Sequence, residues 1–258
     1  MPGNLIRNIL LAACLISSTL AWSQKKLAID SMQLKGVEEV LGDDYGNVYL
    51  YQKKDFSLIK LDSSGTQLAK VMLPFPYKIQ SVVNPLNIVM FSENAQEIKF
   101  LDQNLNDIQK INLGNTFGFV KCIYAEDLQF AWLIDDSNKT LVQYNFRSNT
   151  IINSFPFNID LQGLRDFLVY NNRVYILQDS SFRVYSTQSK LLFSGDFPQA
   201  RKLARRNEDI LIFGAEAVSQ LDGTALSEIF RNPDAKIVDK NSQGFLALIR
   251  DKLYLYKK

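Results

Sequence analysis

Short apolar runs recur along this chain at a nearly constant interval, and each is followed by a segment that alternates apolar and polar positions. The apolar runs are residues 48–50, 88–90, 131–133, 174–176, 210–212 and 245–247. The alternating segments are residues 58–62, 98–102, 141–145, 182–186, 218–222 and 253–257. Successive segments end 35 to 43 positions apart. Two independent markers in one register indicate six copies of one structural unit.

This repeat predicts an all-β protein, a six-bladed β-propeller with four-stranded blades. The first unit gives the expected strands at residues 37–41, 48–51, 58–62 and 67–71. Gly46 and Gly65 fall in the turns between them, where tight hairpins favour a residue that tolerates a positive φ. The first strand of each unit is then the innermost, beside the central channel.

The last unit holds only three expected strands, at residues 236–239, 245–249 and 253–257. The segment 27–33 precedes the first unit, belongs to none of the six, and alternates as a strand does. We therefore expect the N-terminal segment to supply the outermost strand of the last blade. Such a strand would close the ring and cover an exposed edge.

Residues 1–23 have the pattern of a secretory signal peptide, with Arg7 before a largely apolar stretch and Ala21-Trp22-Ser23 as a cleavage site. A second interpretation stays open, because residues 11–14 resemble a bacterial lipobox that would make Cys14 a lipidated, membrane-contacting first residue. The predicted organisation is a signal peptide at 1–23 and one propeller domain at 24–258. We expect a secreted protein, or one held in the periplasm or cell envelope.

Residues 43–49 read Asp-Asp-Tyr-Gly-Asn-Val-Tyr, and residues 61–65 read Leu-Asp-Ser-Ser-Gly. This pattern resembles the repeats of the NHL-like and TolB-like six-bladed propellers, a broad group with many secreted members in Bacteroidetes-type bacteria. Later units keep only part of it, as at residues 171–175 and 241–245. The resemblance runs from residue 37 onward and implies a fold rather than an activity.

The chain of 258 residues has no histidine, which excludes Ser-His-Asp and Cys-His catalysis and His-ligated zinc. Cys122 stands in an apolar stretch, which predicts a buried and unreactive thiol. The formal net charge is +2, and it falls to +1 without Arg7, so nothing indicates a nucleic-acid partner. We expect no cofactor and no bound metal.

The innermost strands, aligned by their offset from the second strands, place six polar residues at one equivalent position. They are the candidate ligand-binding residues of the channel mouth: Glu38, Gln80, Lys121, Arg165, Arg201 and Lys236. Four are cationic and one is acidic, so the ring carries a formal charge of +3 and should attract anions such as carboxylates, phosphates or acidic glycans. The alternative is that these side chains point away from the axis or only solvate a water-filled channel. Glu38 and Asp166 are also expected to neutralise part of this charge by pairing with their neighbours.

A second basic cluster consists of Arg201-Lys202 and Arg205-Arg206. In a strand these cations would divide between two faces and would not form one patch. We therefore predict that the cluster is a solvated turn. Contact of this cluster with a membrane surface or a polyanion stays open as the alternative.

Several carboxylates also invite functional interpretations. Asp43-Asp44, Asp62 and Asp135-Asp136 are expected to form turns, since their spacing matches no dedicated calcium loop. Glu126-Asp127 and Asp166 are candidates for two-acid glycosidase chemistry, which needs no histidine, although no local pattern pairs them.

Aromatic residues gather at the joins between units, at 74–77, at 155–157 and at Phe197-Pro198, with Phe117 and Phe119 at a further join. Their recurrence at equivalent positions favours packing between blades over recognition of a sugar or a protein.

These features favour a non-catalytic binding or scaffold propeller. We expect a monomer whose partner is a protein, or an anionic glycan or small molecule bound at the channel mouth. The alternative is a carbohydrate-active hydrolase or lyase that uses carboxylates at the same mouth. A third possibility is an assembly component that meets proteins along its blade edges.

Overall fold

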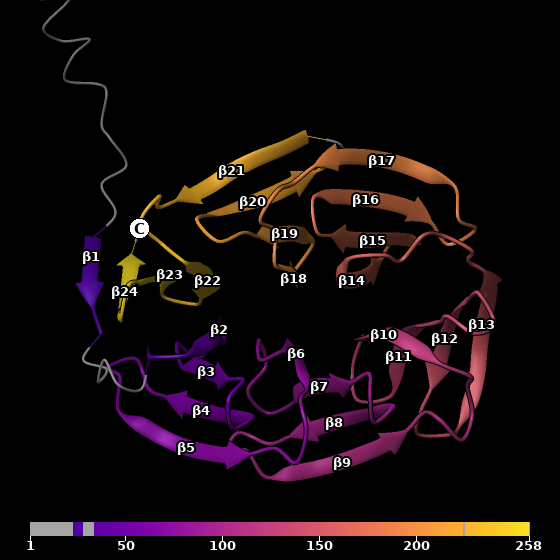
Figure 1. The fold of residues 1–258 in the computed structure, drawn as a ribbon, viewed down its shortest axis with the longest axis horizontal. Helices are drawn as coiled ribbons and strands as arrows, with labels where there is room; N and C mark the ends of the chain where they lie inside the picture. Colours follow the sequence, from indigo (N-terminus) through magenta and orange to yellow (C-terminus); the bar gives the residue numbers. More distant parts are fainter. Residues whose placement is uncertain (1–22, 28–33, 224, 258) are drawn as a thin grey trace, which may run out of the picture.

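The computed structural model describes residues 23–27, 34–223 and 225–257. Within these ranges the chain forms six four-stranded antiparallel sheets around a central axis (Figure 1). The predicted six-bladed β-propeller is confirmed. The same residues contain no helical segment with the length and hydropathy needed to span a bilayer.

Each of the first five blades takes its four strands consecutively from the chain. The first blade is β2 (Val37–Gly42), β3 (Val48–Gln52), β4 (Ser57–Leu61) and β5 (Gln67–Met72). The second is β6 (Lys78–Ser81), β7 (Ile88–Ser92), β8 (Glu97–Leu101) and β9 (Asp107–Asn112). The third is β10 (Val120–Ala125), β11 (Phe130–Asp135), β12 (Thr140–Asn145) and β13 (Thr150–Pro156). The fourth is β14 (Leu164–Tyr170), β15 (Arg173–Gln178), β16 (Ser181–Ser186) and β17 (Leu191–Asp196). The fifth is β18 (Lys202–Arg206), β19 (Asp209–Phe213), β20 (Ala217–Asp222) and β21 (Ala225–Arg231).

The sixth blade combines both ends of the described chain, namely β22 (Ile237–Asn241), β23 (Gly244–Ile249), β24 (Lys252–Lys257) and β1 (Ser23–Lys26). β1 pairs antiparallel with β24, from Ser23 opposite Lys257 to Lys26 opposite Tyr254. The N-terminal segment therefore closes the last blade, as predicted (Figure 1).

The position of the closing strand differs from the expected segment 27–33. The strand ends at Lys26, Leu27 follows it, and residues 28–33 lie outside the described residues. The predicted signal segment also lies outside them, except that Ser23, its last residue, begins β1.

The apolar runs of the sequence are the second strands of the blades, and they are almost completely buried. All five residues of β7 are buried, whereas four of the six residues of the outermost strand β9 are exposed. A second strand is covered on both faces by neighbouring blades, so it reads as a continuous apolar run. The outermost strands have one edge in solvent, and polar residues are interspersed among their apolar ones.

The core is divided into six apolar clusters, each between two adjacent blades. One joins Leu50 of the first blade to Leu255 of the sixth, and another joins Phe100 of the second blade to Leu133 of the third. Leu27 belongs to the first of these clusters and is 1% exposed. Burial between blades, rather than within one sheet, therefore stabilises the ring.

Candidate functional site

The six residues of the predicted ring all lie where the innermost strands begin. Glu38, Gln80, Lys121 and Arg165 each coincide with a register shift between the first and second strands of their blades. Arg201 and Lys236 directly precede β18 and β22, and their amides donate to the carbonyls of Phe213 and Leu248. A β-bulge changes the direction of a side chain, so four blades present a bulge residue at the same end of the channel. We call this end the strand-start mouth.

Five of the six ring residues line one cavity of about 700 Å³ at the strand-start mouth, and they come from five different blades. Lys236 is exposed and is not among the residues that line it. The cavity is also lined by Lys53, Glu93 and Asp179, which lie in the turns after the second strands. The structure therefore brings five of the six aligned residues to one cavity, together with three neighbours that the alignment did not include.

Three of the charged ring residues are paired with those missed neighbours. Lys53 Nζ lies 3.1 Å from a Glu38 oxygen, Lys121 Nζ lies 2.7 Å from Glu93, and Arg165 Nε lies 2.5 Å from Asp179. The Arg165 and Asp179 side chains are each 59% exposed. Exposed pairs of this kind contribute about 0–1 kcal/mol, so these cations are held only weakly. The expected pairing of Glu38 with a neighbouring cation is confirmed.

Arg201 differs from the other ring residues because all three of its donor groups are engaged. Its Nη1 lies 2.6 Å from a Glu39 oxygen, Nη2 donates to the Val238 carbonyl at 2.7 Å, and Nε donates to the Gly214 carbonyl at 3.0 Å. These partners belong to or adjoin the first, sixth and fifth blades. Arg201 thus joins three blades at the channel and has few donors left for a ligand.

Two further ion pairs lie deeper in the channel. Lys78 of the second blade reaches Asp166 of the fourth at 2.5 Å, and Asp166 also accepts hydrogen bonds from the amides of Phe167 and Leu203. Lys202 of the fifth blade is paired with Asp239 of the sixth. Asp166 and Asp239 are both at least 95% buried. The expected pairing of Asp166 is confirmed, and side chains cross the channel rather than lining an open tube.

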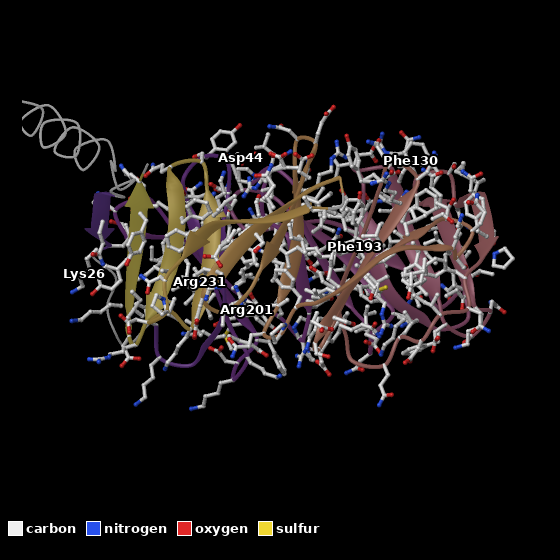
Figure 2. The ribbon with its side chains drawn as sticks, turned by 90° about the horizontal axis from the view of Figure 1, so that it is seen from above. Lys26, Asp44, Phe130, Phe193, Arg201 and Arg231 are labelled. Carbon is white, nitrogen blue, oxygen red and sulfur yellow. The ribbon has the colours of Figure 1, made fainter. Side chains whose placement is uncertain are left out.

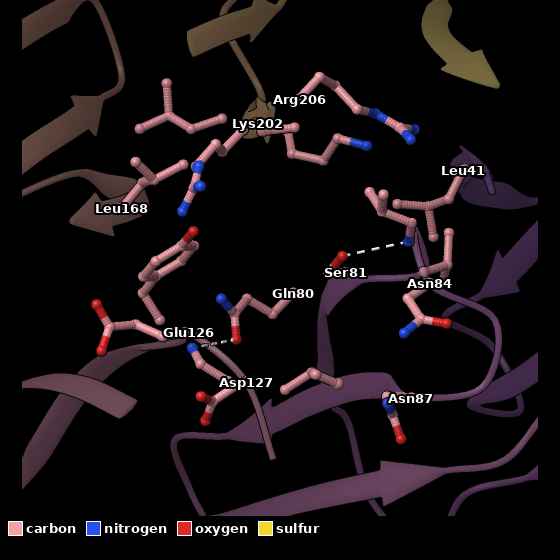
Figure 3. Close-up of a pocket in the computed structure, with 18 of the residues that line it drawn as sticks. Leu41, Gln80, Ser81, Asn84, Asn87, Glu126, Asp127, Leu168, Lys202 and Arg206 are labelled. Carbon is pink, nitrogen blue, oxygen red and sulfur yellow. Dashed lines mark hydrogen bonds between the residues drawn. The ribbon is translucent and has the colours of Figure 1, made fainter. Parts of the chain in front are cut away.

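The opposite end of the channel, which we call the strand-end mouth, holds a larger cavity of about 830 Å³. It is bordered by the turns after the innermost strands, and Figure 3 shows Gln80 between Lys202 on one side and Glu126 on the other. Figure 2 shows the two faces, with Asp44 and Phe130 toward one and Arg201 toward the other. Gln80 and Lys202 line both cavities, which places them midway along the channel.

The prediction of a solvated turn for Arg201-Lys202 and Arg205-Arg206 is wrong, because residues Lys202–Arg206 form strand β18. Lys202 and Arg206 point toward the sixth and first blades, where Arg206 is paired with Asp44 and donates to the carbonyls of Gly42 and Lys240. Arg205 lies over the ring of Tyr170, 4.0 Å from its centroid. Carboxylates distant in sequence thus compensate the charges of Arg201, Lys202 and Arg206, whereas Arg205 is exposed and donates to the nearby Asn207 carbonyl.

The three carboxylates considered for glycosidase chemistry all line the strand-end cavity. Each accepts hydrogen bonds from the protein. Glu126 accepts from Trp132 Nε1 and Gln143 Nε2, both at 3.0 Å, and Asp127 accepts from two amides of its own turn. Asp166 is held by Lys78 as described above. Their contacts therefore serve turns, strand pairing and blade contacts.

The acids expected to form turns do so. One Asp43 oxygen accepts from the amides of Tyr45 and Asn47 at 2.9 and 2.8 Å, and Asp62 accepts from the amides of Ser64 and Thr66. Hydrogen bonds from the Ser64 hydroxyl and the Thr66 amide lower the pKa of Asp62. Within the described ranges, no three histidine, cysteine or acidic side chains gather as a metal site would require.

The aromatic residues at the joins pack between blades, as predicted. Tyr77 and Phe157 are 3% and 1% exposed, and Tyr77 stacks on Phe75 at 4.9 Å. Phe119 is the exception, at 39% exposed. Cys122 is buried, as expected, and burial raises the pKa of its thiol above the ordinary value.

Comparisons with known proteins identify the fold. A propeller of unknown function from Bacteroides thetaiotaomicron superposes with a TM-score of 0.63 at 10% identity, over 92% of this chain and 76% of that one. A streptogramin B lyase gives 0.58 at 11% identity over 92% and 97% of the two chains. Virginiamycin B lyase from Staphylococcus aureus gives 0.57 at 11% identity over 92% and 99%. No family model matches the chain, and no curated protein matches it by sequence.

Proposed function

We propose that this protein is a non-catalytic binding propeller, and that an anionic small molecule or acidic glycan binds at the strand-start mouth. The observation that carries the proposal is that ring residues from five different blades line a single cavity. Convergence of polar groups from separate elements on one concave surface is typical of a binding site.

The charges of this mouth favour an anion. Six cationic and four acidic side chains line the cavity, and the acids that pair with Lys78 and Lys202 line the opposite cavity instead. A concave surface with excess positive charge raises the local concentration of anions.

The ligand would bind by replacing the exposed carboxylates that now accompany the ring cations. Arg165 and Lys121 are the residues best placed for this role, because their partners are side chains of exposed or half-exposed turns. The Arg165 guanidinium can donate two parallel hydrogen bonds to a carboxylate or a phosphate. Arg201 would mainly hold the shape of the mouth.

The proposal is tested by calorimetric titration with inorganic phosphate, citrate and an oligogalacturonate. The double variant Arg165→Gln/Lys121→Gln should weaken binding by about tenfold or more, because two charge-assisted contacts are lost. The matched control Lys70→Gln/Lys110→Gln removes the same charge from exposed outer strands and should bind as the unchanged protein does. Equal affinity of both double variants, or no binding of any of the three anions, would contradict the proposal.

An enzymatic function is the alternative, and two of the similar structures are lyases by name. At 11% identity that likeness extends to the fold alone. The candidate acids Glu126, Asp127 and Asp166 all serve structural hydrogen bonds. For these reasons a binding function is the proposal.

The proposed location is outside the cytoplasm, as a secreted or envelope-associated monomer. The support is the signal pattern of residues 1–23. Intact mass of the protein purified from its native host tests it, with Gln24 expected as the first residue. A first residue at Cys14 with an added lipid mass would favour the lipoprotein instead, and an unprocessed chain would contradict both.

A further inference from the structure

The cavity at the strand-end mouth has no role in the anion site and is the larger of the two. Its volume is about 830 Å³, within the range of cavities that hold small ligands. It is bordered by turns of the first, second, third and fifth blades. Its chemistry differs from that of the strand-start mouth.

Side-chain amides are the distinctive polar groups of this cavity. They are Gln80, Asn84, Asn87, Gln129 and Asn207. The Gln80 oxygen accepts from the Ala125 amide at 3.0 Å, and the Asn84 oxygen accepts from the Leu86 amide at 3.1 Å. Within the described part of the chain, the NH₂ groups of these two amides donate to no protein acceptor. Figure 3 shows the Gln80 side chain extending into the cavity. An amide fixed through its oxygen presents its two N–H donors in a defined direction.

The charges of this cavity balance, in contrast to those of the strand-start mouth. Five cationic and five acidic side chains line it. Arg206 is paired with Asp44, and Lys202 is paired with Asp239. Because paired charges produce little net electric field, electrostatic attraction would add little to the affinity of this cavity for a charged ligand.

Two exposed side chains, one aromatic and one aliphatic, stand on adjacent turns next to residues that line the cavity, and neither of the two is itself a lining residue. Tyr45 follows the lining residue Asp44 and is 69% exposed, and Leu86 lies between the lining residues Asn84 and Asn87 and is 50% exposed. The Asp44 amide donates to the Val83 carbonyl at 2.9 Å, which joins the two turns. Four hydrogen bonds to Asp43, at 2.7 to 3.0 Å, fix the turn that carries Tyr45.

We propose that the strand-end mouth binds an uncharged, hydroxyl-rich ligand, namely a neutral oligosaccharide. Sugar hydroxyls both donate and accept, and they match amide groups that do the same. The apolar C–H face of a pyranose packs against an exposed aromatic ring, which supplies contact area without charge. One amide midway along the channel, further amides on the surrounding turns, balanced charges and an exposed tyrosine on an adjoining turn occur together at this mouth.

The proposal is tested by saturation-transfer NMR with cellohexaose, maltohexaose, mannohexaose and chitohexaose, and with an oligogalacturonate as the acidic comparator. At least one neutral hexasaccharide should bind, with little change in affinity between low and high salt, because no counterion release accompanies it. Tyr45→Ala and Asn87→Leu should each weaken that binding by about tenfold, equivalent to about 1.4 kcal/mol. Phe119→Ala is the matched control and should bind normally, because Phe119 is an exposed aromatic residue directly before β10, at the strand-start end of the channel.

The outcome is independent of the anion site. The Arg165→Gln/Lys121→Gln variant should bind the neutral sugar unchanged, because neither residue lines the strand-end cavity. The proposal is overturned if no neutral hexasaccharide binds, if binding survives both Tyr45→Ala and Asn87→Leu, or if only the acidic oligosaccharide binds. Thermal unfolding of each variant separates loss of a contact from loss of the fold.

Discussion

Closure of the ring by the N-terminal strand depends on one buried side chain. Leu27 directly follows β1, and its amide donates to the Leu253 carbonyl at 3.0 Å. Its side chain is 1% exposed, in the cluster that joins the first and sixth blades. The substitution Leu27→Ala keeps the backbone pairing and removes only the apolar contact.

The expected loss follows from this burial. Removing three buried carbons costs about 2.4 kcal/mol in transfer free energy at about 0.8 kcal/mol for each group. A residual cavity brings the usual range for such substitutions to about 2–5 kcal/mol. We expect about 3 kcal/mol, which corresponds to a fall in Tm of about 6–12 °C for a domain of this size.

Differential scanning calorimetry and urea unfolding measure this loss. Lys25→Ala is the matched control, because Lys25 is an exposed residue of β1 that keeps its pairing with Leu255. It should change the free energy of unfolding by less than about 0.5 kcal/mol. If Leu27→Ala lowered the free energy of unfolding no more than Lys25→Ala does, the contact made by Leu27 would not stabilise the closed ring.

Four other predictions concern single residues. Asp166→Asn should lower the free energy of unfolding by about 2 kcal/mol, as measured by urea unfolding. This is below the usual cost of breaking a buried ion pair, because the Lys78 side chain is 44% exposed. An unchanged free energy of unfolding would show that the pair of Asp166 with Lys78 does not stabilise the ring. The Cys122 thiol, whose pKa burial raises, should react with a thiol reagent only in denaturant, and fast reaction in the folded protein would contradict its burial. Asp62, whose pKa hydrogen bonds lower from 3.8, should stabilise the fold above that pH and lose this contribution as the pH falls further. Asp62→Asn should therefore reduce the loss of stability between pH 5 and pH 3, and an identical loss would refute this role. Gly244→Ala should cost more than about 2 kcal/mol, since Gly244 has a φ of 155° and a Cβ there would lie 2.1 Å from a carbonyl oxygen of β24; normal thermal unfolding would contradict this contact.

The fold was predictable because burial between blades requires short continuous apolar runs, which are visible in the sequence. A second strand covered on both faces must be apolar along its length, as at 88–90 within β7. The closing strand was predicted a few residues too late, because it has no such apolar run. Ser23–Lys26 is an edge strand held by backbone hydrogen bonds, so it carries no apolar pattern, and only Leu27 marks the buried contact.

The position of the ring was also predictable, whereas its electrostatics were not. Equivalent positions in repeats occupy equivalent places, so Lys121 and Arg165 fall at one mouth. Their partners Glu93 and Asp179 follow the second strands directly, and an alignment of those turns would have found them. The carboxylate partners of Arg201 and Arg206 each lie 162 positions away in the chain, and no local pattern can indicate a contact across the channel.

The most direct test of the anion site compares two changes to one ion pair, Arg165 with Asp179. Asp179→Asn removes the carboxylate that competes with the ligand, and Arg165→Gln removes the donor. In calorimetric titration with an oligogalacturonate at low salt, Asp179→Asn should strengthen binding by several-fold and Arg165→Gln should weaken it by about tenfold. Changes in the same direction, or no change in either variant, would contradict an anion site at the strand-start mouth.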